Sequence, residues 1–392
     1  EAEAEVQSVD AGEEEEAEVG FVRKKPASLS FGSIPFDLAF HGKEDRLAVG
    51  LVSGSVEVHK YSVEENFCTL SLKPHDGACR AVLLEGDTLY TCSSDKSVAV
   101  TDLEQGCVVS TWADAHEAPV NCMRSYDVDM LVTGDDDGKL KIWDTRQQKR
   151  VIASFKEHTD FLTDFLCVPW KNTLVAISGD GLLSVYDVRQ RKMYAVSDNQ
   201  DDELLSIAMV KSGKKVVIGT ASGTLLVFRW DRWGDSHDRI PLSSYIPGGS
   251  KNMPYTTGLD MPLDCLLPVN EDTVLCGCAD GRLRSVDILP TAVTTIGEHA
   301  RAIPFESISL SHDKRFLASA ADDQVVKFWS VGHLFNTVSV QLPGEGKKEE
   351  AETSAETPAD EASKEAPKRQ GGELAAPVSK KRKKKGNFFS GL

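Results

Sequence analysis

The chain has 392 residues, with 61 acidic and 44 basic side chains and a formal net charge of −17. This acidic balance argues against a body built for generic nucleic-acid binding, because that affinity comes largely from neutralising phosphates. No segment approaches the roughly 18 consecutive apolar residues of a membrane helix, and no apolar region follows a basic start, so neither a membrane span nor a secretory signal is predicted.

Residues 1–27 are predicted to form an acidic, disordered tail. The first 18 residues contain nine carboxylates and no basic residue. A segment with so much charge and so few apolar side chains cannot bury enough surface to offset the entropy of ordering.

The next segment is dominated by an internal repeat. The phrase TGDDDGKLKIWDTR at Thr133–Arg146 returns in weaker form about every 42 residues, which gives seven copies. Repeats of about forty residues with four strand-like runs each are typical of a β-propeller. We therefore predict an all-β fold, a seven-bladed propeller over residues 28–342. The position of the closing aromatic is occupied in turn by His59, Thr101, Trp143, Tyr186, Phe228, Val286 and Trp329.

The strands of the third copy show the pattern most clearly. Runs rich in Val, Ile, Leu and Thr lie at Asp129–Gly134, Lys139–Asp144 and Arg150–Phe155, and Asp-Gly pairs predict tight hairpins between strands. We expect Thr337–Leu342 to complete the ring as the outer strand of the seventh blade; a strand around Ser28–Phe31 is the alternative. The nine cysteines lie singly in these runs and predict buried free thiols in a reducing compartment.

An Ala-His opening at Ala115–His116 and a Trp-Asp closing at Trp143–Asp144 resemble the WD-repeat family. In that family a His, a Ser or Thr, an Asp and a Trp of one blade form a buried hydrogen-bonded chain. The resemblance implies such chains in the third and seventh copies, and partial ones in the second (His75, Thr91, Asp95) and fourth (His158, Asp180, Tyr186). The two full sets are His116, Thr133, Asp137 and Trp143, and His299, Ser319, Asp323 and Trp329.

No catalytic motif is found. The chain has no phosphate-binding G-x-x-x-x-G-K-[ST] loop, no G-x-S-x-G elbow, no H-E-x-x-H and no zinc quartet. The histidines fall at blade openings, where a structural role is expected. We predict a non-enzymatic protein with no catalytic residue, no metal, no cofactor and no small-molecule substrate.

Two surfaces are predicted to bind partners. The fifth and sixth copies are separated by about 16 additional residues, and this insertion has the composition of an interface hot spot. The alternative is that its aromatic residues pack on their own blade. The rim formed by the strand turns is the second surface, and any RNA contact of the propeller is expected at its arginines, which could equally be solvated charges. The candidates are Trp230, Arg232, Trp233, Arg239 and Tyr245 in the insertion, and Arg80, Arg282, Arg284 and Arg301 on the rim.

Residues 343–392 are predicted to be a disordered linker that ends in a basic targeting segment. Gly344–Pro377 has almost no large apolar residue, and an unbroken basic run follows it. The run predicts a nuclear or nucleolar address with a contact to rRNA phosphates; a solubilising charge run is the alternative. Its members are Lys380, Lys381, Arg382, Lys383, Lys384 and Lys385.

A narrower resemblance is carried by His75–Val82, Phe228–Ile240, Arg315–Trp329 and the basic stretch before the final FFSGL. These segments resemble the WD repeat-containing protein 55 family and its fungal counterparts. The resemblance implies a nucleolar scaffold in ribosomal RNA synthesis and large-subunit assembly, found in the nucleus and nucleolus with the cytoplasm as a further location. It implies partners among the proteins of pre-ribosomal particles, and we expect a monomeric propeller.

A second class of function rests on Trp143, Asp144 and Arg146. The sequence Trp-Asp-Thr-Arg resembles the WD-x-R box of propellers that serve as substrate receptors of cullin-4 RING ubiquitin ligases. In this alternative, Arg146 contacts the ligase adaptor from the rim of the blade.

Overall fold

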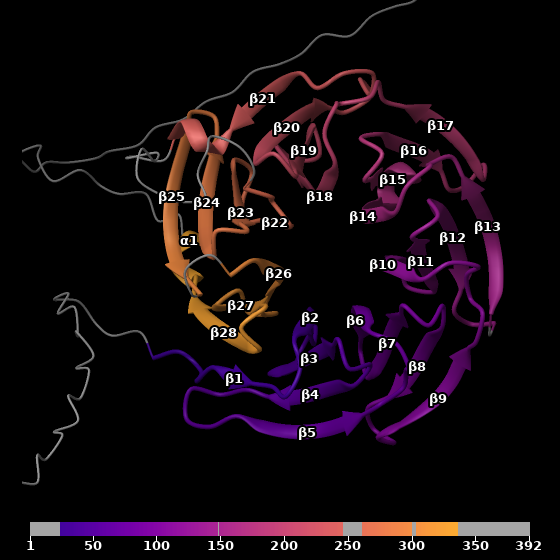
Figure 1. Cartoon of the computed structure of the whole chain (residues 1–392), viewed down its shortest axis with the longest axis vertical. Helices are drawn as coiled ribbons and strands as arrows, with labels where there is room; N and C mark the ends of the chain where they lie inside the picture. The colour runs from indigo at the N-terminus through magenta and orange to yellow at the C-terminus, as the bar shows by residue number, and fades with distance from the viewer. Residues whose placement is uncertain (1–23, 148, 246–260, 300–302, 336–392) are drawn as a thin grey trace, which may run out of the picture. The chain divides into compact units, whose positions relative to one another are not determined.

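The computed structural model describes residues 24–335, except residues 148, 246–260 and 300–302. Seven antiparallel sheets of four strands are arranged around a central axis, as Figure 1 shows. The all-β, seven-bladed propeller predicted from the repeat is therefore confirmed. None of the described helices is long and apolar enough to cross a membrane.

The blades follow one another along the chain, each running from the innermost to the outermost strand. Blade 1 comprises β2 (Pro35–Phe40), β3 (Arg46–Leu51), β4 (Val56–Lys60) and β5 (Phe67–Leu72). Blade 2 comprises β6 (Cys79–Glu85), β7 (Thr88–Ser93), β8 (Val98–Asp102) and β9 (Cys107–Trp112). Blade 3 comprises β10 (Val120–Asp127), β11 (Met130–Asp135), β12 (Lys139–Asp144) and β13 (Arg150–Lys156). Blade 4 comprises β14 (Leu162–Val168), β15 (Thr173–Ser178), β16 (Leu183–Asp187) and β17 (Lys192–Val196), with the 3-10 turn η1 (Pro169–Lys171) after β14.

The remaining three blades complete the ring. Blade 5 comprises β18 (Leu204–Val210), β19 (Lys215–Thr220), β20 (Thr224–Arg229) and β21 (Asp238–Pro241), followed by the 3-10 turn η2 (Leu242–Tyr245). Blade 6 comprises β22 (Cys265–Pro268), β23 (Thr273–Gly277), β24 (Arg282–Ile288) and β25 (Thr291–Glu298). Blade 7 comprises β26 (Phe305–Leu310), β27 (Phe316–Ala321), β28 (Val325–Ser330) and β1 (Leu29–Ser30), and the short helix α1 (Gly332–Phe335) follows β28.

The ring is closed by the beginning of the chain. Strand β1 pairs with β28 through Leu29 opposite Val326, and the backbone N–H of Phe31 donates to the carbonyl of Gln324 at 2.9 Å. The prediction that Thr337–Leu342 forms this outer strand is therefore wrong, because β1 occupies the position beside β28; residues 337–342 lie outside the described part of the chain. The alternative strand around Ser28–Phe31 is confirmed. The apolar side chains of Leu29 and Phe31 account for this pairing, since both are buried in the core between blades 7 and 1.

The core lies between adjacent blades. The second strand of each blade is buried along almost its whole length, as in RLAVGL of β3 and MLVTGD of β11, whereas the outermost strands bury few of their residues. All nine cysteines are free, but Cys68 and Cys107 are exposed, contrary to the expectation that every thiol is buried. Both belong to outermost strands, β5 and β9, whose outer side meets solvent.

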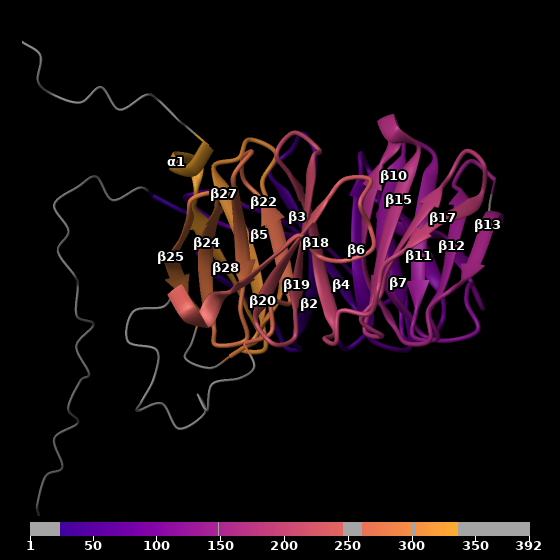
Figure 2. The ribbon, with the colours of Figure 1, turned by 90° about the horizontal axis from the view of Figure 1, so that it is seen from above.

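The two faces of the ring differ in their connections. Face A carries the segments that lead into each innermost strand and the turns between second and third strands; face B carries the turns between first and second strands and between third and fourth strands. In Figure 2 the ring is seen edge-on, with α1 on face B at the top. The predicted hairpins lie on face A, where Gly138 and Gly281 have φ of 77° and 82°, a conformation that favours glycine.

Candidate functional site

The hydrogen-bonded chain predicted for blade 7 is present with all four residues. The ring of His299 contacts Asp323 through Nδ1 at 3.1 Å and Ser319 Oγ through Nε2 at 2.6 Å. The indole N–H of Trp329 donates to the same Ser319 Oγ at 2.7 Å. Burial lowers the pKa of His299 below its usual value, so the ring is neutral near pH 7 and serves structure.

Blade 3 has the same chain with a different carboxylate. His116 Nε2 contacts Thr133 Oγ1 at 2.7 Å and Trp143 Nε1 donates to that oxygen at 2.7 Å, as expected. His116 Nδ1, however, contacts Asp135 Oδ2 at 2.8 Å, and Asp137 is exposed. The assignment of Asp137 is therefore wrong. Asp135 ends β11 and points into the blade, and its second oxygen accepts from the backbone N–H groups of Asp137 and Lys139, so it shapes the turn as well.

Blades 2 and 4 complete their chains with serines that the sequence analysis did not assign. In blade 2, His75 Nδ1 contacts Ser97 Oγ at 2.8 Å, and Ser97 donates to Asp95 at 2.5 Å. In blade 4, His158 Nε2 contacts Ser184 Oγ at 2.6 Å, and Ser184 in turn contacts the phenol oxygen of Tyr186 at 3.0 Å. Both serines could have been predicted from spacing, because Ser97 lies two residues after Asp95 and Ser184 lies two residues before Tyr186.

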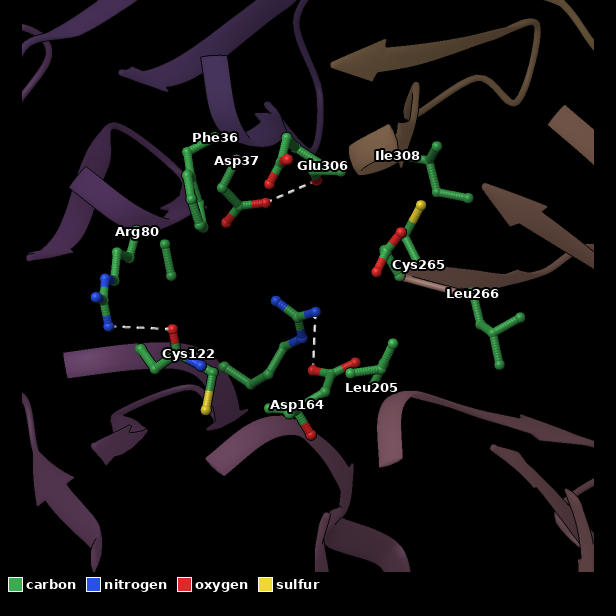
Figure 3. Close-up of a pocket in the computed structure, with 16 residues that line it drawn as sticks. Phe36, Asp37, Arg80, Cys122, Asp164, Leu205, Cys265, Leu266, Glu306 and Ile308 are labelled. Carbon is green, nitrogen blue, oxygen red and sulfur yellow. Dashed lines mark hydrogen bonds and ion pairs between the residues drawn. The ribbon is translucent and has the colours of Figure 1, made fainter. Parts of the chain in front are cut away.

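The central channel opens on face A into a polar cavity of about 260 Å³ (Figure 3). It is built by β-bulges, because six of the seven innermost strands contain one extra residue near their start, which re-aims the local side chains. The extra residues all line the cavity: Phe36, Arg80, Asn121, Thr163, Leu205 and Glu306. This site was missed in the sequence, where a bulge has no clear signal within a short strand.

Hydrogen bonds join several pairs of neighbouring blades around the channel mouth. Asn121 donates to the carbonyl of Leu162 at 2.8 Å, and Thr163 donates to the carbonyl of Leu204 at 2.8 Å. Ser206 likewise donates to the carbonyl of Leu263, just before blade 6, at 2.6 Å. Blade 7 is joined to blade 1 in the same way, because Ser307 donates to the Asp37 carboxylate at 2.7 Å. These polar contacts hold the innermost strands in register while apolar contacts fill the space behind them.

The charge of the channel mouth is predominantly acidic. Asp37 and Glu306 lie on one side of the opening and Asp164 on the other (Figure 3). Burial raises the pKa of Asp37 and of Asp164, although Arg124 opposes the shift and contacts Asp164 at 2.9 Å. Burial, together with nearby carboxylates, raises the pKa of Glu306 to about 7. The pKa of Glu306 therefore lies near neutral pH, whereas Asp164 is paired with Arg124.

A similar shift affects Asp264, whose pKa is raised to about 6 by burial. Glu306 and Asp264 line the same cavity, so a cationic group of a partner, such as a lysine or arginine side chain, would restore their charge on binding. Neither a nucleophile with an adjacent base nor a preorganised oxyanion site accompanies these carboxyl groups among the described residues of the cavity. The arrangement suits recognition of a partner.

The rim arginines of face A are engaged with carboxylates. Arg80 contacts both oxygens of Asp136 in the next blade at 2.7 and 2.8 Å. Arg284 is 1% exposed and pairs with Asp280, and Arg282 pairs with Glu298 at 3.4 Å. The charges of Arg80, Arg282 and Arg284 are therefore paired within the protein, and their contact with a partner stays a prediction; Arg301 lies outside the described residues.

The described part of the insertion, up to Tyr245, contains β21 of blade 5 and the turn η2. Trp233 is 4% exposed and belongs to the core between blades 4 and 5, so it is not available to a partner as had been expected. Trp230 packs edge-on against it, with ring centroids 5.0 Å apart. Tyr245 and Arg232 are exposed, and Arg239 donates to Gln200 at 3.2 Å. The two tryptophans therefore pack on their own blade, which is the alternative given in the sequence analysis. Residues 246–260 lie outside the described residues.

Arg146 lies in the turn that follows β12 on face B. Its guanidinium contacts both oxygens of Asp144 at 3.0 and 3.1 Å, and 67% of its side chain is exposed. Trp143 is buried, so of the three residues of the WD-x-R box only Arg146 presents a large exposed surface. The basic run at residues 380–385 lies outside the described residues.

Two small groups of side chains bring potential metal ligands together. One consists of Glu57, His59 and Cys68 on blade 1, and the other of Asp45, His312 and Asp313. His59 Nε2 already contacts Glu57 at 2.9 Å, and Asp313 is paired with an arginine. Since structural zinc sites are built from four Cys or His ligands, neither group has their composition.

The seven blades, each with an inward-facing strand and four of them with a His-centred hydrogen-bonded chain, define a WD-repeat β-propeller, a class of protein-interaction scaffold. A chain in the crystal structure of the mitotic checkpoint complex has the same fold, with a TM-score of 0.65 and 17% identity over 84% of this chain and 99% of that one. This likeness concerns the fold alone.

The chain belongs to the WDR55 family, whose model matches residues 26–334. It is 34% identical to the WD repeat-containing protein 55 homolog of Dictyostelium discoideum, over 79% of this chain and 72% of the relative. Human WD repeat-containing protein 55 is 34% identical over 80% and 78%, and WD repeat-containing protein JIP5 of Coprinopsis cinerea is 33% identical over 79% and 74%. WD-repeat proteins of this family are non-enzymatic scaffolds for protein interactions.

Proposed function

We propose that this propeller is a nucleolar scaffold that acts in ribosome biogenesis, in ribosomal RNA synthesis or processing and in large-subunit assembly. Membership of the WDR55 family across residues 26–334 is the observation that carries the proposal. The partially neutral carboxyl groups of the channel mouth and the unbroken basic run at residues 380–385 support it, since ribosomal proteins are rich in basic side chains and the run has the composition of a nucleolar address.

The partners are proteins of pre-ribosomal particles, bound at face A through the channel mouth. A lysine or arginine inserted between Glu306 and Asp264 would find two carboxyl groups whose charge is restored by the contact. The basic run supplies a further contact with rRNA phosphates and directs the protein to the nucleus and nucleolus.

The test is affinity purification of the tagged full chain from nuclear extract, with and without nuclease, beside a truncation after Pro377. Recovery of pre-ribosomal particles by the full chain, with loss on truncation, is the expected result. Full recovery after truncation would remove the targeting role from the basic run. Absence of ribosomal components from both preparations would contradict the proposal.

The adaptor-box alternative is favoured by the exposure of Arg146 on face B. Replacing Arg146 by Glu places a negative charge beside Asp144 and Asp129, which Arg146 now contacts. If the cullin-4 adaptor dominates the purification and this substitution removes it, the ligase-receptor function replaces the ribosomal one. Recovery of particles that is unchanged by Arg146→Glu supports the scaffold.

A further inference from the structure

Positive charge is concentrated on face B at the turns of blades 4 and 5. Four segments form this surface, residues 169–173, 187–192, 210–215 and 229–235, and we call it the blade 4–5 patch. It contains nine basic residues and three acidic ones, although the whole chain has a net charge of −17. The corresponding turns of blade 2, residues 85–88 and 102–106, contain four acidic residues and no basic one. The basic residues of the patch are Lys171, Arg189, Arg191, Lys192, Lys211, Lys214, Lys215, Arg229 and Arg232.

Most of these charges are not neutralised within the protein. Lys211 pairs with Asp272 of blade 6, but Arg189, Arg191 and Arg232 are exposed and have no ion-pair partner among the described residues. The arginines of face A, by contrast, are paired with carboxylates. The surface able to release counterions on binding a polyanion is therefore on face B, opposite the acidic channel mouth.

Aromatic rings lie among these cations. Trp170 on η1 is 72% exposed and Tyr194 on β17 is 62% exposed, which is unusual for large aromatic side chains. The Nζ of Lys171 lies 3.6 Å from the ring centroid of Trp230 and donates to the carbonyl of Gly213 at 2.7 Å. Lys171 thereby joins the turns of blades 4 and 5, which are neighbours in the ring (Figure 1).

A groove of about 480 Å³ crosses the boundary between these two blades. Lys171 and Tyr194 contribute from blade 4, and Trp230 contributes from blade 5. The groove therefore combines aromatic surface with an ammonium group. Its remaining lining residues are Thr173, Tyr186, Asp187 and Asp231.

We propose that the blade 4–5 patch binds single-stranded RNA. A surface whose unpaired cations lie beside exposed aromatic rings matches both parts of a single strand, because phosphates meet the cations and unstacked bases meet the rings. An acidic peptide would use the cations alone and would leave the exposed faces of Trp170 and Tyr194 without a purpose. That the strand is RNA and not DNA rests on the proposed function in ribosome biogenesis; the binding of a single strand rests on the surface alone.

The test is fluorescence anisotropy with a labelled oligouridine of about twelve nucleotides, a length suited to a surface of this kind. The protein is the full chain with the six basic residues at 380–385 replaced by Gln, so that the tail contributes no phosphate contacts. One variant carries Arg189→Gln, Arg191→Gln and Lys192→Gln. A second carries Trp170→Ala and Tyr194→Ala. The matched control carries Lys149→Gln, Arg150→Gln and Lys156→Gln, three exposed basic residues of blade 3.

The two variants should lose RNA affinity with different salt dependence. Loss of three phosphate contacts should lower affinity about tenfold and reduce the slope of log K against log salt by about 2, at roughly 0.7 for each contact. Loss of two stacking rings should lower affinity about tenfold or more with an unchanged salt slope. The blade 3 control should remain within about twofold of the parent, because it removes the same charge from a blade without exposed aromatic rings.

Four results would contradict the proposal. Equal losses in the blade 3 control would show generic attraction, and unchanged affinity in both patch variants would place binding elsewhere. Competition by a polyglutamate peptide at equal charge would assign the patch to acidic peptides. An equally tight complex with the deoxy oligonucleotide would remove the preference for RNA. The assay uses purified protein and synthetic RNA, so its failure is distinguishable from failure of the scaffold function, which is measured by particle recovery.

Discussion

Replacing Asp135 by alanine should destabilise the protein far more than replacing Asp137, although the two carboxylates belong to one turn. Asp135 is fully buried and accepts three hydrogen bonds, from His116 Nδ1 and from the backbone N–H groups of Asp137 and Lys139. The substitution leaves the ring N–H of His116 buried without an acceptor, which costs about 1–3 kcal/mol, and removes two turn bonds worth about 1 kcal/mol together. The expected loss is about 3 kcal/mol.

Asp137 makes a different contribution. Its side chain is exposed and accepts no hydrogen bond among the described residues, so Asp137→Ala should change the free energy of unfolding by less than about 0.5 kcal/mol. This variant is the matched control, since it removes the same charge two residues away. Asp135→Asn should recover part of the loss, because the amide oxygen can still accept one of the bonds.

Thermal unfolding followed by circular dichroism measures the difference. For a propeller of roughly 300 residues, an entropy of about 2.1 cal/mol/K per residue converts 3 kcal/mol into a shift of about 5 °C in Tm. The midpoint of Asp137→Ala should lie within about 1 °C of the parent. Equal losses for the two alanine variants, or a larger loss for Asp137→Ala, would refute the assignment of Asp135 to the hydrogen-bonded chain of blade 3.

Three further predictions concern the ring and its channel. Because the pKa of Glu306 is raised to about 7 from 4.5, the folded state binds this proton more tightly than the unfolded chain, and the free energy of unfolding falls as pH rises from about 5 to 8. Relative to the parent, Glu306→Gln should raise the free energy of unfolding by about 1–2 kcal/mol at pH 8 and by little at pH 4. Parallel profiles of Tm against pH for the two proteins would contradict this prediction. Leu29→Asp should lower Tm by about 5 °C through loss of the closing strand, whereas Ser30→Asp, at an exposed neighbour, should not. Ser206→Ala should lower the urea midpoint by the equivalent of about 1–2 kcal/mol, because the buried carbonyl of Leu263 loses its donor; an unchanged midpoint would show that this contact between blades is dispensable.

The repeat allowed the number of blades and most strands to be predicted, because strand alternation and Asp-Gly hairpins are local properties of the chain. The hydrogen-bonded chain of blade 7 was predicted from the resemblance to the WD-repeat family, and His299, Ser319, Asp323 and Trp329 each occupy the expected position. Blade 3 was ambiguous, since three consecutive aspartates occupy its turn and spacing alone does not say which one faces inward. The choice is made by the register of β11, which places Asp135 opposite Val120 inside the blade.

The candidate sites depend on contacts between distant segments and were largely beyond prediction. The channel mouth is formed by one bulged residue from each of six blades. The sequence of one blade therefore does not predict which side chains of the other blades lie beside its bulged residue. Whether an arginine is free also depends on the neighbouring blade, as Arg80 and Asp136 illustrate. The basic residues of blades 4 and 5 were scattered among acidic segments of the sequence, and the fold brings them to one face.

The pairing of β1 with β28 makes the order of synthesis matter. A ribosome releases the chain from its amino end, so Leu29 must wait for Val326 to emerge, almost 300 residues later, before the last sheet can be completed. Until then β1 has no partner strand, and a foreign strand could add to its unpaired backbone groups. A nascent or truncated chain that stops within blade 6 thus leaves β1 without its partner strand, and only a chain that extends through β28 can close the ring.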